Sequence, residues 1–399
     1  MIQNLPFDPI TENNWNTLLR SLRRKVNPEQ AEAEKLDCIL ILGPEPLLSN
    51  IPSDNQDFKP LLDSFCEQIL DKLKTDRKTE LEGDPGLSHF RVMEQFRRAY
   101  GMDADALYEE LYQKVYTLEN IHPVFHKKLP FVPFPLIINT SHDELLRDAF
   151  AQAGMHSTES SYFSYQLNSP QKKLKPPTAE SPVIYNLFGS IADPQSMVTV
   201  PGDLLEYVFS IIQRGEDQLD KIITDAVRDA KHIIFLGFDF ESWHLKILLR
   251  YFKINHPKMN NPKVTYARPW KLQSRETEEF FKNTFNVTFV KDNVIEFIEN
   301  LYDRCARNPG MLRKPTVKKK TSFRDRLSDL VVNGKIDQAF VKWKEYGESN
   351  EVAREDYFKM HYEWGVTQRE YLDKPELLRE ETGKLVLKML KLISLYDHE

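Results

Sequence analysis

The stretch that decides the fold is VIYNLFGSIADPQSMVTV, residues 183–200. It opens with a short apolar run, turns at Gly189 and Ser190, and resumes an apolar pattern after Asp193 and Pro194. A short apolar run that stops at a glycine predicts a fully buried β-strand whose exit loop lies at one edge of a sheet. We therefore expect residues 186–190 to lie where a sheet of this kind binds its ligand.

Similar apolar runs occur before and after this stretch, at residues 36–42, 136–138, 233–236, 264–266 and 287–290. Segments with helical periodicity separate them, including a helical insertion at about residues 60–130. Continuous apolar strands that alternate with helices predict a parallel sheet with helices on both faces, because both faces of such strands must be covered. The predicted fold class is α/β, with a Rossmann-like parallel sheet.

The composition bears on which partners, metal sites and cellular location are expected. The 399 residues are 41% hydrophobic and carry a net charge of −6, which gives no electrostatic case for nucleic acid as a partner. No apolar run approaches the roughly 20 residues that a membrane span needs. The three cysteines form no CxxC pair, so we expect no metal site. Because the first residues also lack a signal-peptide pattern, the expected location is the cytoplasm.

The C-terminal part differs from the rest of the chain. Residues 304–320 contain seven basic residues and no acidic one, and prolines interrupt them, which predicts a solvated linker at 306–321. Apolar residues then recur at helical spacing, which predicts a small helical bundle over residues 322–399. The bundle sequence has no catalytic cluster of His, Cys or acidic residues. We expect an adaptor or oligomerisation module, and hence a protein partner or a homo-oligomer.

The turns that follow the predicted strands carry a family resemblance. They read LGPEPLL (42–48), NTSHDELL (139–146), NLFGSIADPQSMV (186–198), FLGFDFESWHLKILLR (235–250) and VKDNVIEFI (290–298). Taken in order, they resemble the sirtuin-like family, especially the bacterial branch found in anti-phage defence. The resemblance covers roughly residues 11–305 and implies a sirtuin-like Rossmann-type domain over residues 1–305.

The resemblance implies NAD as a cofactor and names the residues near it. The cofactor-binding positions that it implies are Gly43, Asn139, Asp143, Gly189, Ser190, Gly237, Asp292 and Asn293. The family's glycine turn exposes N–H groups to the pyrophosphate, but this chain has Pro44 and Glu45 there. Proline has no N–H to donate, and a carboxylate repels a pyrophosphate.

The residues expected to perform the family's chemistry are altered. The family uses a His as general base and an Asn to orient the ribose or water, whereas this chain has Phe188 and Ser141 at those positions. A phenyl ring cannot accept a proton, so we expect Phe188 to pack beneath the cleft. His142 and Ser141 are the residues that could replace the missing groups, because His142 is next to Asp143 in the same turn.

Two functions follow from the resemblance. In the first, the chain is a catalytically degenerate scaffold or nucleotide sensor of a bacterial defence system that oligomerises or recruits a partner through its C-terminal helices. In the second, it is an active NAD-hydrolysing effector with a rearranged site that uses His142 or Ser141. The substitutions at Phe188, Ser141 and Pro44 favour the first function.

Overall fold

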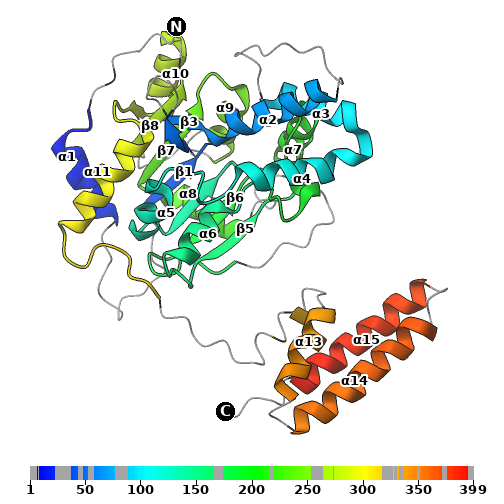
Figure 1. The fold of residues 1–399 in the computed structure, drawn as a ribbon. Coiled ribbons are helices and arrows are strands. Elements are labelled where there is room, and N and C mark those ends of the chain that lie inside the picture. The colour runs from blue at the N-terminus through cyan, green and yellow to red at the C-terminus, as the bar shows by residue number, and fades with distance from the viewer. Residues whose placement is uncertain are drawn as a thin grey trace. The chain divides into compact units, whose positions relative to one another are not determined.

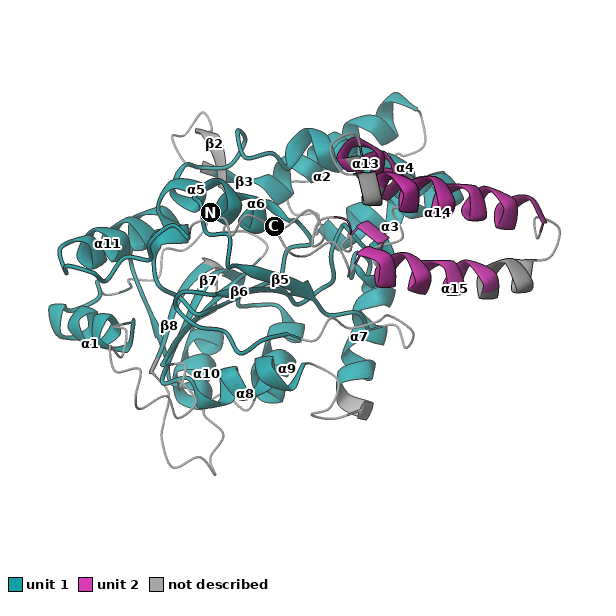
Figure 2. Ribbon diagram, turned by 90° about the horizontal axis from the view of Figure 1, so that it is seen from below, with its two compact units in different colours: residues 1–316 teal, residues 317–399 magenta. Residues whose placement is uncertain are grey.

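The computed structural model describes most of the chain as two compact units, residues 1–316 and 317–399 (Figure 2). Each unit is described separately. The described residues are 7, 9–22, 37–43, 48–52, 58–76, 89–165, 174–214, 220–252, 264–272, 274–316, 327, 330–331, 336–347, 351–370 and 375–393. Pro44, Glu45 and the end of the predicted linker lie outside them.

The first unit is built on a seven-stranded sheet in which all neighbouring strands are parallel (Figure 1). The strand order is β5-β6-β4-β1-β7-β8-β9. The strands are β1 (Cys38–Leu42), β4 (Leu136–Asn139), β5 (Glu159–Tyr162), β6 (Val183–Asn186), β7 (His232–Asp239), β8 (Val264–Lys271) and β9 (Val287–Phe289). A separate antiparallel pair consists of β2 (Leu48–Pro52) and β3 (Phe58–Pro60). The predicted parallel sheet and its six predicted strands are confirmed.

Helices cover both faces of the sheet, with α5, α6 and α11 on one face and α8, α9 and α10 on the other (Figure 2). Residues within β1 alternate between two hydrophobic clusters: Cys38, Leu40 and Leu42 belong to one, Ile39 and Ile41 to the other. This alternation explains why the strand sequence is continuously apolar.

The helices of the first unit include those of the predicted insertion. Their bounds are α1 (Glu12–Leu22), α2 (Leu61–Thr75), α3 (His89–Tyr100), η2 (Gly101–Asp103), α4 (Ala104–Val115), α5 (Val124–Lys127), η3 (Leu129–Phe131), α6 (Leu145–Gln152), η4 (Pro194–Ser196), α7 (Pro201–Arg214), α8 (Lys221–Asp229), α9 (Trp243–Tyr251), α10 (Arg275–Phe285) and α11 (Val294–Ala306). None of the helices within the described ranges is long and apolar enough to cross a membrane.

The strand order predicts where in the sheet a ligand would bind. From β1 the chain continues through β4 to β6 on one side, and then crosses to the other side of β1 to form β7, β8 and β9. In open sheets of parallel strands, ligands bind beyond the carboxyl ends of the strands where the order reverses. That reversal lies between β1 and β7, which are neighbours in register from Cys38 to Leu42.

The first part of the predicted solvated linker belongs to the first unit. We expected residues 306–321 to be solvated, but the first unit extends to Thr316. Arg313 is only 2% exposed, and its guanidinium donates to the backbone oxygens of Pro130, Phe134 and Ala179 at 2.6 Å each. A buried arginine is tolerated when its N–H groups are paired in this way. Arg313 therefore fixes residues 306–316 to the domain.

The second unit consists of α13 (Ile336–Gly347), α14 (Glu351–Glu370) and α15 (Pro375–Ile393), together with the helical residues Leu327, Leu330 and Val331. Its core contains Trp343, Met360 and Met389, all of which are fully buried. The separate cluster of buried side chains agrees with the predicted helical module, and whether it folds alone stays a prediction.

We expect Arg313→Met to destabilise the first unit by about 3–5 kcal/mol, because three buried carbonyl oxygens lose their charged donor. Lys314→Met is the matched control, since Lys314 is the exposed neighbour of Arg313 and should change stability by less than about 0.5 kcal/mol. Urea unfolding monitored by tryptophan fluorescence measures both variants. Equal stabilities of the two variants would contradict the role given to Arg313.

Candidate functional site

Two asparagines join the strand ends that were expected to form the site. Asn139 and Asn186 are opposite each other in the last register positions of β4 and β6. Asn139 Nδ2 donates to Asn186 Oδ1 at 3.3 Å, and Asn139 Oδ1 accepts from the Ser141 N–H at 3.2 Å. Asn186 Nδ2 donates to the Asp143 carbonyl oxygen at 2.9 Å. Both side chains are buried, so their amides hold the turn after β4 in place.

Asp143 is the buried acid of this turn. It is 1% exposed, and its Oδ1 accepts from the N–H of Leu145, the first residue of α6, at 2.9 Å. The other carboxylate oxygen, Oδ2, is buried and meets no donor in hydrogen-bonding geometry within the described part of the chain. Burial raises the pKa of the Asp143 carboxyl group. The nearby side chains of Ser141 and Asn139 oppose this shift, so polar groups of the protein surround the Asp143 carboxylate.

The turn after β6 requires its glycine. Gly189 has φ 91°, and a Cβ atom at this position would lie 2.2 Å from the backbone oxygen of Ser196. The neighbouring Ser190 is fully buried, donates through Oγ to Glu144 Oε1 at 2.7 Å and accepts from the Ala192 N–H at 3.2 Å. These contacts make Gly189 and Ser190 structural parts of the turn.

Phe188 packs, as the sequence predicted. Its side chain is 7% exposed and belongs to the hydrophobic cluster on the α7–α10 face of the sheet. The ring contacts Tyr207 edge-on, with centroids 5.1 Å apart, and lies 6.1 Å from the His244 ring. No atom of the side chain can accept a proton. The position that resembles the family's base therefore performs a packing role.

His142 and Ser141, the expected replacements, occupy the turn after β4. His142 Nε2 lies 3.1 Å from the Val198 carbonyl oxygen. If Nε2 carries the proton donated in this contact, Nδ1 is the remaining acceptor. Burial lowers the pKa of His142 to about 4, so the ring is neutral at pH 7. Ser141 is 7% exposed, and its backbone N–H is bonded to Asn139.

Two further histidines lie near His142. His89, at the start of α3, lies against Phe90 with tilted rings and centroids 4.1 Å apart, and the Phe90 ring lies 6.2 Å from the ring of His244 in α9. Burial, together with the charges that His142 and His244 would carry, lowers the pKa of His89 to about 3. Burial alone lowers the pKa of His244 to about 4. No sequence spacing links these residues, so the cluster could not be predicted.

A polar cavity of about 310 Å³ opens near this cluster. Its lining includes Arg97, Asp105, Tyr165 and Asp203, so it lies between the α3–α4 insertion and the chain after β6. Arg97 NH1 lies 3.5 Å from Asp203 Oδ2. Asp203 Oδ2 also accepts from the N–H of Thr199 at 3.0 Å. Thr199 follows Val198, whose carbonyl oxygen lies 3.1 Å from His142 Nε2, so the cavity lies near the turn after β4.

The remaining predicted residues divide between two places. Gly43 donates its N–H to the Leu236 carbonyl oxygen at 2.9 Å, and a Cβ on Gly43 would lie 2.1 Å from the Gly237 oxygen. These glycines therefore adjoin at the β1–β7 crevice. Asp292 and Asn293 follow β9, three strands from β1, which is a lateral separation of about 14 Å. Asn293 there forms the capping box of α11 with Glu296.

The structure thus brings most of the predicted residues together at the carboxyl edge of a doubly wound sheet, which defines a Rossmann-like α/β domain. Residues 135–290 match the family described as the SIR2-like domain. The match begins at β4 and ends after β9, so it includes the turns after β4, β6 and β7. No curated protein matches the chain. The chain therefore carries a SIR2-like domain, which confirms the resemblance over this segment.

Within the described ranges, no group of three or more His, Cys, Asp or Glu side chains is arranged to hold a metal ion. The three histidines of the cluster are therefore best described as neutral rings in an aromatic environment.

The histidine cluster predicts a loss of stability in acid. The pKa values of His89, His142 and His244 in the folded state, about 3, 4 and 4, are below the ordinary value of 6.5. Between pH 6.5 and 4 the unfolded chain therefore binds more protons, so stability falls as the pH is lowered. We expect a lower thermal midpoint at pH 5.0 than at pH 7.5.

His244→Phe should reduce this pH dependence, because it removes one titrating ring and leaves an aromatic side chain against Phe188. His156→Gln, at an exposed histidine, is the control and should keep the wild-type difference between the two pH values. Differential scanning fluorimetry measures the midpoints. An unchanged pH dependence in His244→Phe would show that His244 does not contribute.

Gly189→Ala should destabilise the domain by more than about 3 kcal/mol, because the new Cβ meets backbone and the residue keeps a positive φ. Gly202→Ala is the control: a Cβ at Gly202 meets nothing within 4 Å. Its stability should stay within about 0.5 kcal/mol of wild type. A stable Gly189→Ala protein would show that this turn adapts.

Proposed function

We propose that the chain is a SIR2-like nucleotide-binding scaffold or sensor that binds a dinucleotide such as NAD without hydrolysing it at an appreciable rate. Its C-terminal helices would couple binding to self-association or to a partner. The observation that carries the proposal is the packing of Phe188 against Tyr207, in the place where the family's general base is expected. A role in bacterial defence rests on the resemblance of the strand-end turns, and a place in the cytoplasm rests on the cysteine pattern and the first residues of the sequence.

The fold supports dinucleotide binding. The reversal of strand order lies between β1 and β7, and the close approach of Gly43 to Gly237 leaves no room for a side chain there. The two glycines let the ends of β1 and β7 pack closely, and ligands of such sheets bind beyond this point of the sheet. In this arrangement the turn after β7 would hold the phosphates, and the Asp143 carboxylate would accept from a ribose hydroxyl. NAD itself would supply the nicotinamide–ribose bond that hydrolysing relatives cleave.

The side chains argue against hydrolysis. A missing general base costs about 10²–10⁴-fold in rate. Asn139, the amide nearest to the altered Ser141 position, already has both ends of its amide engaged, with Asn186 and Ser141. Ser190 Oγ is likewise bonded to Glu144. These polar groups stabilise the turns and would have to break protein contacts in order to orient a ribose or a water molecule.

Active NAD hydrolysis is the second candidate, and His142 is the observation in its favour. Its ring is neutral and has one nitrogen outside the Val198 contact, as a general base requires. The low pKa opposes this role, since an imidazole with a pKa of about 4 is a weak proton acceptor at neutral pH.

Purified full-length protein incubated with millimolar NAD distinguishes the two functions. We expect a higher thermal midpoint, since a ligand at 100 times its Kd adds about 2.7 kcal/mol to stability. We expect nicotinamide release no faster than in a heat-denatured control. Robust release that His142→Ala abolishes would establish the second function instead. If NAD caused neither stabilisation nor release, the nucleotide-binding proposal would be wrong.

Hydrogen–deuterium exchange locates the binding. Peptides that contain Gly43 or Gly237 should exchange more slowly with NAD present, and peptides from α10 provide the internal control. Protection confined to other parts of the first unit would place the ligand elsewhere.

A further inference from the structure

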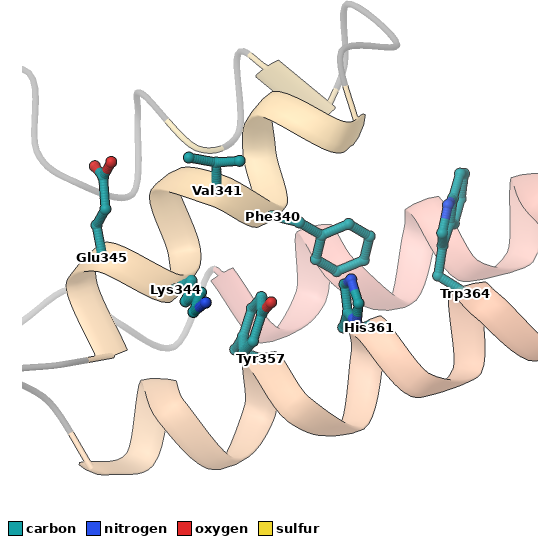
Figure 3. Close-up of a pocket in the computed structure, with 7 residues that line it drawn as sticks. All are labelled: Phe340, Val341, Lys344, Glu345, Tyr357, His361 and Trp364. Atoms are coloured by element: carbon teal, nitrogen blue, oxygen red, sulfur yellow. The ribbon is translucent and has the colours of Figure 1, made fainter.

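Helix α14 has apolar residues on two sides. Tyr357 and Met360 are 8% and 0% exposed and belong to the core of the second unit. Figure 3 shows Tyr357, His361 and Trp364 of α14 on the side that lines a pocket with Phe340 of α13. Phe358 and Tyr362, in contrast, are 57% and 70% exposed. A helix that is apolar on two sides is usually covered on both.

The exposed aromatic residues belong to one face of α14. Glu355, Phe358, Tyr362, Val366 and Arg369 follow one another at intervals of three, four, four and three residues. Such spacing places side chains along a single face of a helix. We call this set the outer stripe. Val366 is half-buried, and the other four residues of the stripe are exposed.

The position of the outer stripe separates it from the pocket in Figure 3. At 100° per residue, Phe358 and Tyr362 point about 100–140° away from Tyr357. The pocket, with a volume of about 530 Å³, is lined by Tyr357, His361 and Trp364 of α14 and by residues of α13. On the other side, Glu363 binds Lys388 of α15 at 2.5 Å. The outer stripe is therefore directed away from both neighbouring helices.

The outer stripe is complementary to itself. Phe358 and Val366 lie four residues on either side of Tyr362, and Glu355 and Arg369 lie seven residues on either side. In an antiparallel pair of α14 helices crossing at Tyr362, each Phe358 would face Val366 of the other copy. Each Glu355 would face Arg369 of the other copy. Opposite charges at both ends of the stripe favour this pairing, whereas a parallel pair would bring like charges together.

From this pattern we propose that the outer stripe of α14 is a homodimer interface, in which two copies of the chain pair antiparallel about a twofold axis at Tyr362. A twofold interface uses the same surface on both copies, which is what a self-complementary stripe provides. Gly365 lies beside the stripe, and a Cβ there would meet only the Arg369 guanidinium, at 3.9 Å. This leaves space for a second helix to approach closely.

The proposed dimer interface is small. A helix of 20 residues is about 30 Å long, so two crossing helices bury less than the roughly 1,200 Å² of a standard interface. We therefore expect a dimer with a Kd in the micromolar range. The inference specifies the self-association part of the proposed function. It does not depend on nucleotide binding, and its test is performed without nucleotide.

Sedimentation equilibrium of the full-length chain, from about 1 to 100 µM, tests the interface. The wild type should approach twice its monomer mass of 46.8 kDa. Tyr362→Glu should raise the dimer Kd at least tenfold, because it places two carboxylates at the axis. Leu387→Glu is the matched control, since Leu387 is an equally exposed apolar residue, at 69%, on α15. This variant should dimerise like the wild type.

A charge reversal tests the antiparallel arrangement. Glu355→Arg and Arg369→Glu should each raise the dimer Kd about threefold to tenfold, because each creates two like-charge contacts. The double variant Glu355→Arg/Arg369→Glu should restore the wild-type Kd. A monomeric wild type, a Tyr362→Glu protein that dimerises normally, or a double variant without restored affinity would each overturn the proposal. A loss of dimer in Leu387→Glu alone would place the interface on α15.

Discussion

The hydrogen bond between Asn139 and Asn186 is the interaction on which the candidate site depends. It joins the last residues of β4 and β6 side by side, and the remaining amide atoms hold Ser141 and Asp143. Both amides are buried, so the loss of either would leave polar atoms without partners at a cost of about 1–3 kcal/mol each. The positions of Ser141, His142 and Asp143 are consequently set by the sheet and do not need a ligand to order them.

This rigidity has a consequence for chemistry. A polar group already engaged in the protein must exchange that contact for one with a substrate, and the exchange reduces what it adds to a transition state. Asn139, Ser190 and the His142 Nε2 atom are all engaged in this way. These contacts hold the turns after β4 and β6 in a fixed shape.

The sequence predicts the sheet because each buried strand must be apolar on both faces, and that requirement leaves continuous runs such as the one at residues 38–42. The rule does not apply to β5, which is a half-buried edge strand with the polar sequence ESSY. The burial of Arg313 could not be predicted either, since an arginine among prolines and lysines has the composition of a solvated segment. Its three carbonyl partners come from residues more than 130 positions away.

Some features of the site residues could likewise be predicted from the sequence, and others could not. Gly189 could be predicted, because a tight turn after a buried strand demands a residue that tolerates positive φ. The capping role of Asn293 could also be predicted from the sequence, because Asn followed three residues later by Glu is typical of a helix start. The proximity of His89 to His142 and His244 could not be predicted, because residues 89, 142 and 244 share no spacing. Helices α3 and α9 both pack against α7, which brings two of the three histidines near each other.

Binding and turnover place different demands on such a domain. Binding in a sheet of this kind depends on the reversal of strand order, which lies between β1 and β7. Turnover depends on individual side chains, and the phenyl ring of Phe188 occupies the position where a proton acceptor is expected. A fold can therefore lose the second property and keep the first. For a sensor this separation is an advantage, because a ligand that is not consumed remains bound for as long as its concentration exceeds the Kd.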